Sequence, residues 1–221
     1  MRDFIGLLYP RRFALFDKLN ANAQFVQIRR AFQAAPVARD RTALHELVSE
    51  HVGQRRVDYL EFGVWTGISL ALWSRLNKHP DSRLFGFDTF EGLPEDWGRV
   101  PKGTFSARGA TPQFADSRIQ LIVGLFQQSL YPFLSSYQRG GQLVIHIDCD
   151  LYTSTLYCLA AMDRLLQPGD ILIFDDFYSL EHEFDAYLDY SRSFYRRLTP
   201  LASSRYCAQA AVIVEPITGN P

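Results

Sequence analysis

Four aspartates in two pairs are the residues of this chain best suited to chemistry. Asp148 and Asp150 lie in the segment HIDCDLY, Asp175 and Asp176 lie in IFDDF, and each pair closes an apolar run. Residues just beyond the carboxyl ends of central strands line the ligand crevice of an open parallel sheet, so we expect the two pairs to face each other across one site. A bound cation or a shared proton would relieve their repulsion. The alternative is that Asp150 and Asp176 cap the helices that follow them.

The elements that would position these pairs alternate along the chain. Short apolar runs at 57–62, 83–88, 118–124, 142–148 and 170–175 are separated by helix-like segments at 69–77, 129–137 and 155–166. This alternation predicts an α/β fold, with a parallel sheet covered by helices. A helix is expected from Glu181 to Ser193. Two final runs, near Leu198 and at 209–216, are expected to pair as a terminal hairpin.

Before residue 57 the apolar spacing is helical. Residues 42–52 cover about three turns at this spacing. An earlier stretch, residues 11–35, shows it at Phe13, Phe16, Leu19, Phe25, Ile28 and Phe32. We therefore expect an N-terminal helical arm, residues 1–52, ahead of a main domain of residues 53–221. The aromatic face of the first helix is most simply core, and the alternative is a homodimer contact.

The composition of the chain limits the classes of function that it can have. The chain has 221 residues, of which 47% are hydrophobic and 21% charged, as in ordinary globular proteins. Residues 1–60 carry ten basic and six acidic side chains, but the basic ones are dispersed, so we expect no nucleic-acid partner. The opening FIGLLYP is too short for a membrane span. Three cysteines without metal-binding spacing favour a cytoplasmic location.

A glycine-containing loop follows the first expected strand. In EFGVWTG, Gly63 permits a tight turn and Gly67 lets the next helix start close beneath a ligand. Asp88 closes the second strand, where a carboxylate can accept both hydroxyls of a ribose. The loop has Trp65 at its centre and begins with Glu61, whose charge disfavours a pyrophosphate and favours a ligand that bears an amino group and a sulfonium.

Five motifs, in this order, resemble the macrocin O-methyltransferase family of class I S-adenosylmethionine-dependent enzymes. They are EFGVWTG, GFDTFEGLPEDW, the GLF of residues 124–126, HIDCDLYTST, and LQPGDILIFDDF followed by HEF. The resemblance spans residues 58–190 and implies a Rossmann-like sheet of seven mostly parallel strands, the last antiparallel. It also implies that S-adenosyl-L-methionine contacts Glu61, Gly63, Trp65 and Gly67, with its ribose on Asp88.

By the same resemblance Asp148, Asp175 and Asp176 hold a magnesium ion, and Asp150 lies beside the acceptor hydroxyl. The chain departs from the family in two places. The third strand and its continuation, IQLIVGLFQQ, carry no carboxylate, so no residue is assigned to the adenine. Gln128 stands where relatives often have an acidic residue, which leaves an amide as the candidate contact.

Methyl transfer requires an aligned acceptor oxygen that loses its proton as the new bond forms. Asp150 is the candidate base. His182, which opens the last helix, is a second catalytic candidate, whereas His146, on a strand buried on both sides, is expected to be a core histidine. The irregular, Gly- and Pro-rich segment 94–117, with Trp97 and Phe105, is expected to form a lid over the site.

We therefore expect an S-adenosylmethionine-dependent O-methyltransferase of natural-product biosynthesis, assisted by magnesium. Its expected acceptor is a hydroxyl of a small metabolite, either a sugar or another polyhydroxyl group. Two alternatives remain. Clustered aspartates also suit a metal-dependent phosphoester hydrolase, against which the glycine loop and Asp88 argue. The other is a non-catalytic nucleoside-binding protein, against which the intact acidic pairs argue.

Overall fold

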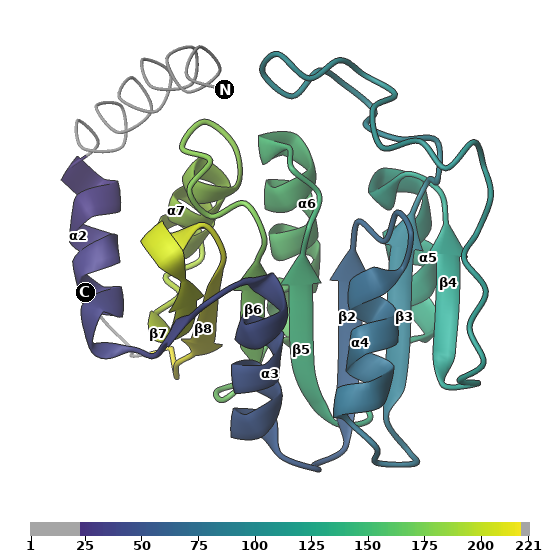
Figure 1. Ribbon diagram of the computed structural model, residues 1–221, viewed down its shortest axis with the longest axis horizontal. Coiled ribbons are helices and arrows are strands. Elements are labelled where there is room, and N and C mark those ends of the chain that lie inside the picture. The colour runs from purple at the N-terminus through teal and green to yellow at the C-terminus, as the bar shows by residue number, and fades with distance from the viewer. Residues whose placement is uncertain (1–22, 218–221) are drawn as a thin grey trace, which may run out of the picture.

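The computed structural model describes residues 23–217. A single eight-stranded sheet lies between two layers of helices (Figure 1). The strands are β1 (Val37–Ala38), β2 (Val57–Phe62), β3 (Arg83–Asp88), β4 (Ile119–Val123), β5 (Gln142–Ile147), β6 (Ile171–Phe174), β7 (Leu198–Ser204) and β8 (Ala210–Val214). The α-helices are α2 (Ala23–Ala31), α3 (Arg41–Val52), α4 (Ile68–Leu76), α5 (Phe126–Ser136), α6 (Tyr152–Met162) and α7 (Glu183–Ser193). Short 3₁₀ turns span Phe32–Ala34, Asp163–Leu165 and Arg205–Cys207.

The sheet confirms the predicted α/β architecture. Its strand order is β1-β7-β8-β6-β5-β2-β3-β4, in which β8 runs antiparallel to both neighbours and every other pair is parallel. The terminal hairpin predicted from the last two apolar runs is β7 and β8. The predicted count of seven strands is wrong, because the two-residue β1 adds an eighth beside β7, where the Ser203 amide donates to the Pro36 carbonyl at 3.0 Å. Two residues are too few to show an alternating pattern.

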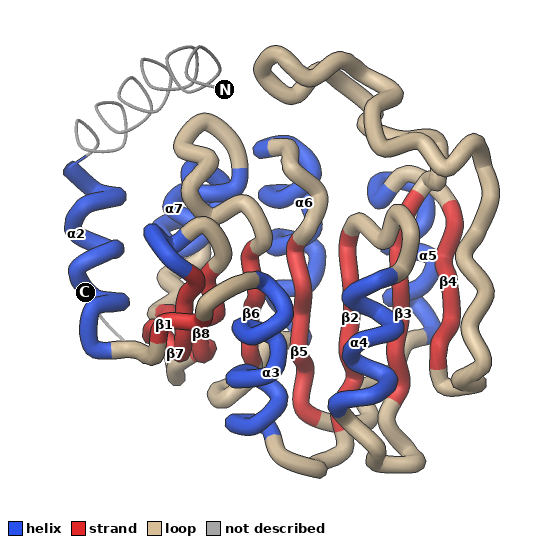
Figure 2. The backbone as a smooth tube through the Cα atoms, in the orientation of Figure 1, coloured by secondary structure: helices blue, strands red, loops and turns tan. Residues whose placement is uncertain are grey.

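The central strands are buried on both faces, as expected for a parallel sheet covered by helices. Every residue of β2 is buried. Helices α3 and α4 cover one face, and α5, α6 and α7 cover the other (Figure 2). The core is accordingly split in two, with Tyr59 and Trp73 on the first face and Phe62 and Phe174 on the second. This arrangement leaves the carboxyl edge of the parallel strands as the place where polar side chains gather.

The chain before β2 packs onto the same sheet. Phe25 meets Phe184 of α7 edge-on at 5.0 Å between ring centroids, and Phe32 meets Phe177 at 5.9 Å. The helix expected to run to residue 35 ends at Ala31, because Pro36 favours extended backbone at Ala35. Of the first helix's predicted apolar face, Phe13, Phe16 and Leu19 lie outside the described residues.

Helix α3 begins close to the carboxyl edge of the sheet. The side chain of Asp40 accepts a hydrogen bond from the Ala43 amide at 2.8 Å, which caps the helix and makes Arg41 its first residue. Among the described helices, none is both long and apolar enough to cross a lipid bilayer.

Candidate active site

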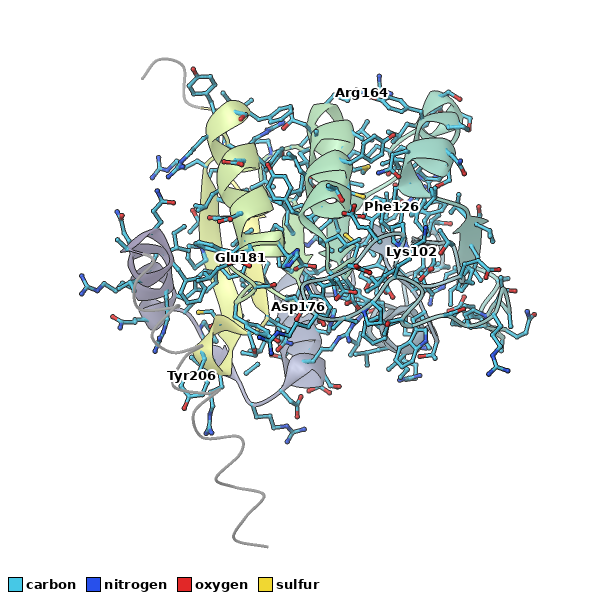
Figure 3. The ribbon with its side chains drawn as sticks, turned by 90° about the horizontal axis from the view of Figure 1, so that it is seen from above. Lys102, Phe126, Arg164, Asp176, Glu181 and Tyr206 are labelled. Atoms are coloured by element: carbon cyan, nitrogen blue, oxygen red, sulfur yellow. The ribbon has the colours of Figure 1, made fainter. Side chains whose placement is uncertain are left out.

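One cavity of about 260 Å³ at the carboxyl edge of the sheet brings the two aspartate pairs together. Its acidic lining residues are Asp88, Asp148, Asp150, Asp175 and Asp176. Seen from above the strand ends, Asp176 lies near the middle of the molecule, between Glu181 and Lys102 of the long loop (Figure 3). The structure thus assembles the carboxylates as the positions of the strand ends predict.

These carboxylates do not serve as helix caps. The N-cap residues of α6 and α7 are Leu151 and His182, and neither helix has a side-chain cap. The alternative that Asp150 and Asp176 cap these helices is therefore wrong. Asp150 also adopts a left-handed backbone conformation with φ of 60°. Sparsely populated conformations of this kind tend to cluster at functional sites.

Three of the aspartates converge closely enough to share a cation. Ligand atoms of Asp148, Asp150 and Asp176 all lie within 4.8 Å of one another. Burial, together with the charge of Asp175, raises the pKa of Asp148 to about 7. Burial and the hydrogen-bonded carboxyl of Asp150 raise the pKa of Asp176 to about 8. A bound cation would favour the charged forms that burial and mutual repulsion disfavour.

Arg41 is the main residue that sequence reasoning missed. Its Nη2 donates to Asp148 Oδ2, and its Nε lies 2.9 Å from Asp175 Oδ1. It is the single basic side chain among the described residues that line the cavity. The Asp40 cap predicts where α3 starts, but no spacing in the sequence shows that the first residue of this helix reaches the two carboxylates.

A buried polar chain lies behind the cavity. Glu61 accepts from the hydroxyls of Tyr59 and Ser69, each at 2.7 Å, and the Tyr59 oxygen lies 3.1 Å from His146 Nδ1. His146 Nε2 is 3.6 Å from Asp175 Oδ1, too far for a hydrogen bond. Burial alone would lower the pKa of His146, but the Asp175 and Glu61 carboxylates raise it to about 9. The predicted core histidine therefore lies between two acids that favour its protonated form.

A second group of potential ligands, His45, His146 and Asp175, does not suit a metal ion. Trp73 Nε1 donates to His45 Nδ1 at 2.9 Å, so the neutral ring of His45 carries its proton on Nε2 and offers no lone pair there. Burial lowers the pKa of His45, which keeps this ring neutral. The raised pKa of His146 likewise disfavours the unprotonated form that a metal requires.

The glycine loop is tied to the end of β3 by Asp88. Its Oδ2 accepts from the amides of Val64 and Trp65, and its Oδ1 accepts from the Phe90 amide, each at 2.7 Å. A carboxylate can accept about four hydrogen bonds, and backbone amides already occupy three of these positions in Asp88. A ribose hydroxyl would therefore bind at the remaining position. Gly63 is required by a close approach, since a Cβ there would lie 1.7 Å from the Asp148 carbonyl oxygen.

Not every predicted cofactor residue lines this cavity. Gly63, Trp65 and Asp88 do. Four predicted residues are absent from its described lining: Glu61, Gly67, Gln128 and His182. Glu61 is fully buried, and Gly67 is the N-cap residue of α4 with φ of 78°. At the start of α5, Gln127 takes the lining position in place of Gln128.

The long loop meets the rest of the site at three points. Trp97 lies against His182 with 6.2 Å between ring centroids, and Phe105 lies against Trp65 at 5.6 Å. Thr153 of α6 donates to Glu95 at 2.5 Å. The loop rises above the strand ends in Figure 1, and Pro94, Trp97 and Phe105 line the cavity. Its aromatic side chains therefore form one wall of the site.

Comparisons with known proteins assign the chain to a family. Residues 60–177, more than half of the chain, match a family described as a methyltransferase domain. The chain belongs to this methyltransferase family. The assignment and the strand order confirm the class I methyltransferase fold implied by the motifs.

Individual relatives agree with this assignment. The chain is 29% identical over 154 residues to 8-demethyl-8-(2,3-dimethoxy-alpha-L-rhamnosyl)-tetracenomycin-C 4'-O-methyltransferase of Streptomyces olivaceus, a match that covers 60% of the chain and 57% of that relative. The chain thus spans little more than half of the relative's length. The calicheamicin methyltransferase CalS11 shares the fold with a TM-score of 0.60 and 21% identity, over 79% of this chain and 80% of that one. A structure described as cmcI-D160 Mg-SAM matches with a TM-score of 0.52 and 22% identity, over 80% of this chain and 72% of that one.

The three amide hydrogen bonds of Asp88 predict a structural cost independent of any ligand. Asp88→Ala should lower the free energy of unfolding by about 2–4 kcal/mol, because three backbone donors lose a charged acceptor. Urea denaturation without ligand measures this change. Glu91→Ala, which removes an exposed carboxylate three residues later, should stay within about 0.5 kcal/mol. Equal stability of the two variants would show that these hydrogen bonds do not hold the loop.

Proposed function

We propose that this protein is an S-adenosylmethionine-dependent O-methyltransferase that acts on a hydroxyl of a small natural product, with a divalent cation at the aspartate cluster. The observation that carries the proposal is a single cavity lined by both aspartate pairs, the glycine loop and Asp88. Membership of the methyltransferase family supports the reaction type. The Streptomyces olivaceus relative is named as a 4'-O-methyltransferase of a tetracenomycin that bears a rhamnosyl group, which supports a sugar or other polyhydroxyl acceptor.

The donor set fits a magnesium ion. Oxygen ligands select hard cations, and the three converging side chains are all carboxylates. We assign the ion to Asp148, Asp175 and Asp176. In the structure Asp175 points toward Arg41 and His146, and Asp150 completes the closest group instead. Asp148 and Asp176 belong to both sets, so variants of the other two aspartates distinguish them. When bound, magnesium would lower the pKa of an acceptor hydroxyl.

Asp150 is the proposed general base. It lines the cavity and is the third residue after the end of β5, and burial raises its pKa. A raised pKa suits a carboxylate that accepts a proton near neutral pH. His182 lies outside the lining residues, against Trp97, and burial lowers its pKa. We therefore propose that His182 supports the lid, with Asp150 as the residue that receives the proton.

The cavity walls have the character expected for a carbohydrate or similar acceptor. Trp65 and Phe105 are 47% and 40% exposed, so both offer aromatic surface against which a ligand can stack. The carboxylates that line the same cavity can accept hydrogen bonds from ligand hydroxyls. The phosphoester-hydrolase alternative loses its support, because family membership and the glycine loop both favour methyl transfer.

The direct test of this function is cofactor binding followed by turnover. S-Adenosylhomocysteine should bind the protein in calorimetry, and labelled S-adenosylmethionine with magnesium should transfer its methyl group to an acceptor in a panel of rhamnosides and other glycosides. Cofactor binding without transfer to any hydroxylated acceptor would favour the non-catalytic alternative. Absence of cofactor binding would refute the proposed function.

Asp176→Asn tests the cation site. Loss of one charged ligand should weaken magnesium binding on the order of 10- to 100-fold, and raised magnesium should partly restore turnover. Calorimetric titration of magnesium measures the affinity. The matched control is Asp189→Asn, which changes an exposed α7 carboxylate bonded to the Tyr152 hydroxyl and should leave magnesium affinity unchanged. Full activity after exhaustive chelation would exclude a role for the cation.

Asp150→Asn tests the base. Removing it should lower turnover by roughly 10²- to 10⁴-fold, because a positioned base contributes that much to proton removal. Magnesium and S-adenosylhomocysteine affinities should remain those of the wild type, whereas Asp175→Asn should weaken magnesium binding. The reverse pattern, with metal affinity lost in Asp150→Asn and retained in Asp175→Asn, would make Asp150 the ligand and invalidate its assignment as base.

A further inference from the structure

A second, smaller cavity adjoins the first at the glycine loop. It measures about 100 Å³ and shares Arg41, Trp65 and Asp148 with the larger cavity. Its remaining lining residues are Thr42, His45, Val64, Thr66, Ile68, Ser69 and Leu72. The small cavity therefore lies between the first turns of α3 and α4, and a ligand seated over the glycine loop can extend into it.

The two cavities differ in charge. Five aspartates line the larger one, and Asp148 is the single acid among the described residues that line the smaller one. Arg41 has its Nη2 bonded to Asp148, and none of the described residues accepts from its Nη1. Its side chain is 41% exposed. A guanidinium has five N–H donors in a fixed fork, so Arg41 can pair with these acids and still bind a further carboxylate.

The proposed cofactor carries charges of both signs. Its sulfonium and amino groups are cationic and suit the acidic cavity, whereas its carboxylate would be repelled there. The cofactor carboxylate therefore needs a position beside the glycine loop that offers a cation and few acids. Among the described residues that line the two cavities, Arg41 is the one permanently charged cation.

We propose that Arg41, together with the hydroxyl of Thr42, binds the carboxylate of the cofactor's methionyl group in the small cavity. This inference rests on the proposed function, since it assumes that S-adenosylmethionine is the ligand. It fixes the direction of the cofactor, with the ribose at Asp88 and the amino-acid end against α3. It also makes the segment before β2 a part of the cofactor site.

The test compares two ligands that differ in the carboxylate. S-Adenosylhomocysteine and its decarboxylated analogue are titrated calorimetrically against wild-type protein and variants, in the presence of a chelator. Arg41→Met should weaken S-adenosylhomocysteine binding roughly 10- to 100-fold and leave the analogue unaffected, because one charge-assisted pair is lost. Thr42→Val should weaken the same ligand selectively and by less. The control Arg39→Met, an exposed arginine that pairs with Asp40, should change neither.

A triple variant separates contact from screening. If Arg41 acts merely by neutralising the two carboxylates that it pairs with, then Arg41→Met combined with Asp148→Asn and Asp175→Asn would restore binding of S-adenosylhomocysteine, and the proposal would be wrong. Direct contact predicts that binding stays weak in the triple variant. The proposal would also be overturned if Arg41→Met weakened the binding of both ligands equally, or weakened the binding of neither. Failure of both ligands to bind the wild type would refute the proposed function itself, and this inference with it.

Discussion

Mutual repulsion among carboxylates at the ends of β5 and β6 is the constraint to which the surrounding structure responds. Parallel pairing of these strands puts Asp148 and Asp175 side by side, and each is followed by a further aspartate. The fold places two basic side chains beside them, Arg41 from α3 and the buried His146 from β5 itself. Burial and the neighbouring carboxylates outweigh these two partners, so the pKa values of Asp148 and Asp176 remain raised.

The second constraint is the close approach of the glycine loop to β5. With Gly63 against the Asp148 carbonyl, no side chain fits between the loop and the acidic cluster. Asp88 then holds the loop from the other side through backbone amides. The loop is therefore held from two sides before any ligand arrives. Its exposed Trp65 adopts a positive φ of 46°, which a bulky residue accepts only when its surroundings impose it.

Much of this site was predictable because it depends on strand order. Carboxyl ends of neighbouring parallel strands meet at one edge, so residues that follow apolar runs are brought together wherever the runs pair. Asp88, Asp148, Asp150, Asp175 and Asp176 all follow this rule. Glu61 and Gln128 were predicted to contact the cofactor but do not line the cavity. The direction of a side chain depends on its place in the alternation of a strand or in the turn of a helix, which the strand order does not give. Glu61 is within β2, where it turns into the core toward Ser69, and the start of α5 at Phe126 directs Gln127 to the cavity.

The short β1 strand has a consequence for how this chain tolerates change in length. Only Arg39 and Asp40 separate the end of β1 from Arg41, and β1 is anchored to β7 by two residue pairs. Each residue of an α-helix turns the chain by about 100°, so one residue inserted at the start of α3 would rotate this side chain away from the acids without unfolding the helix. The connection between β1 and α3 should therefore be a segment in which natural variants keep a constant length, although it lies at the surface and carries no catalytic group of its own.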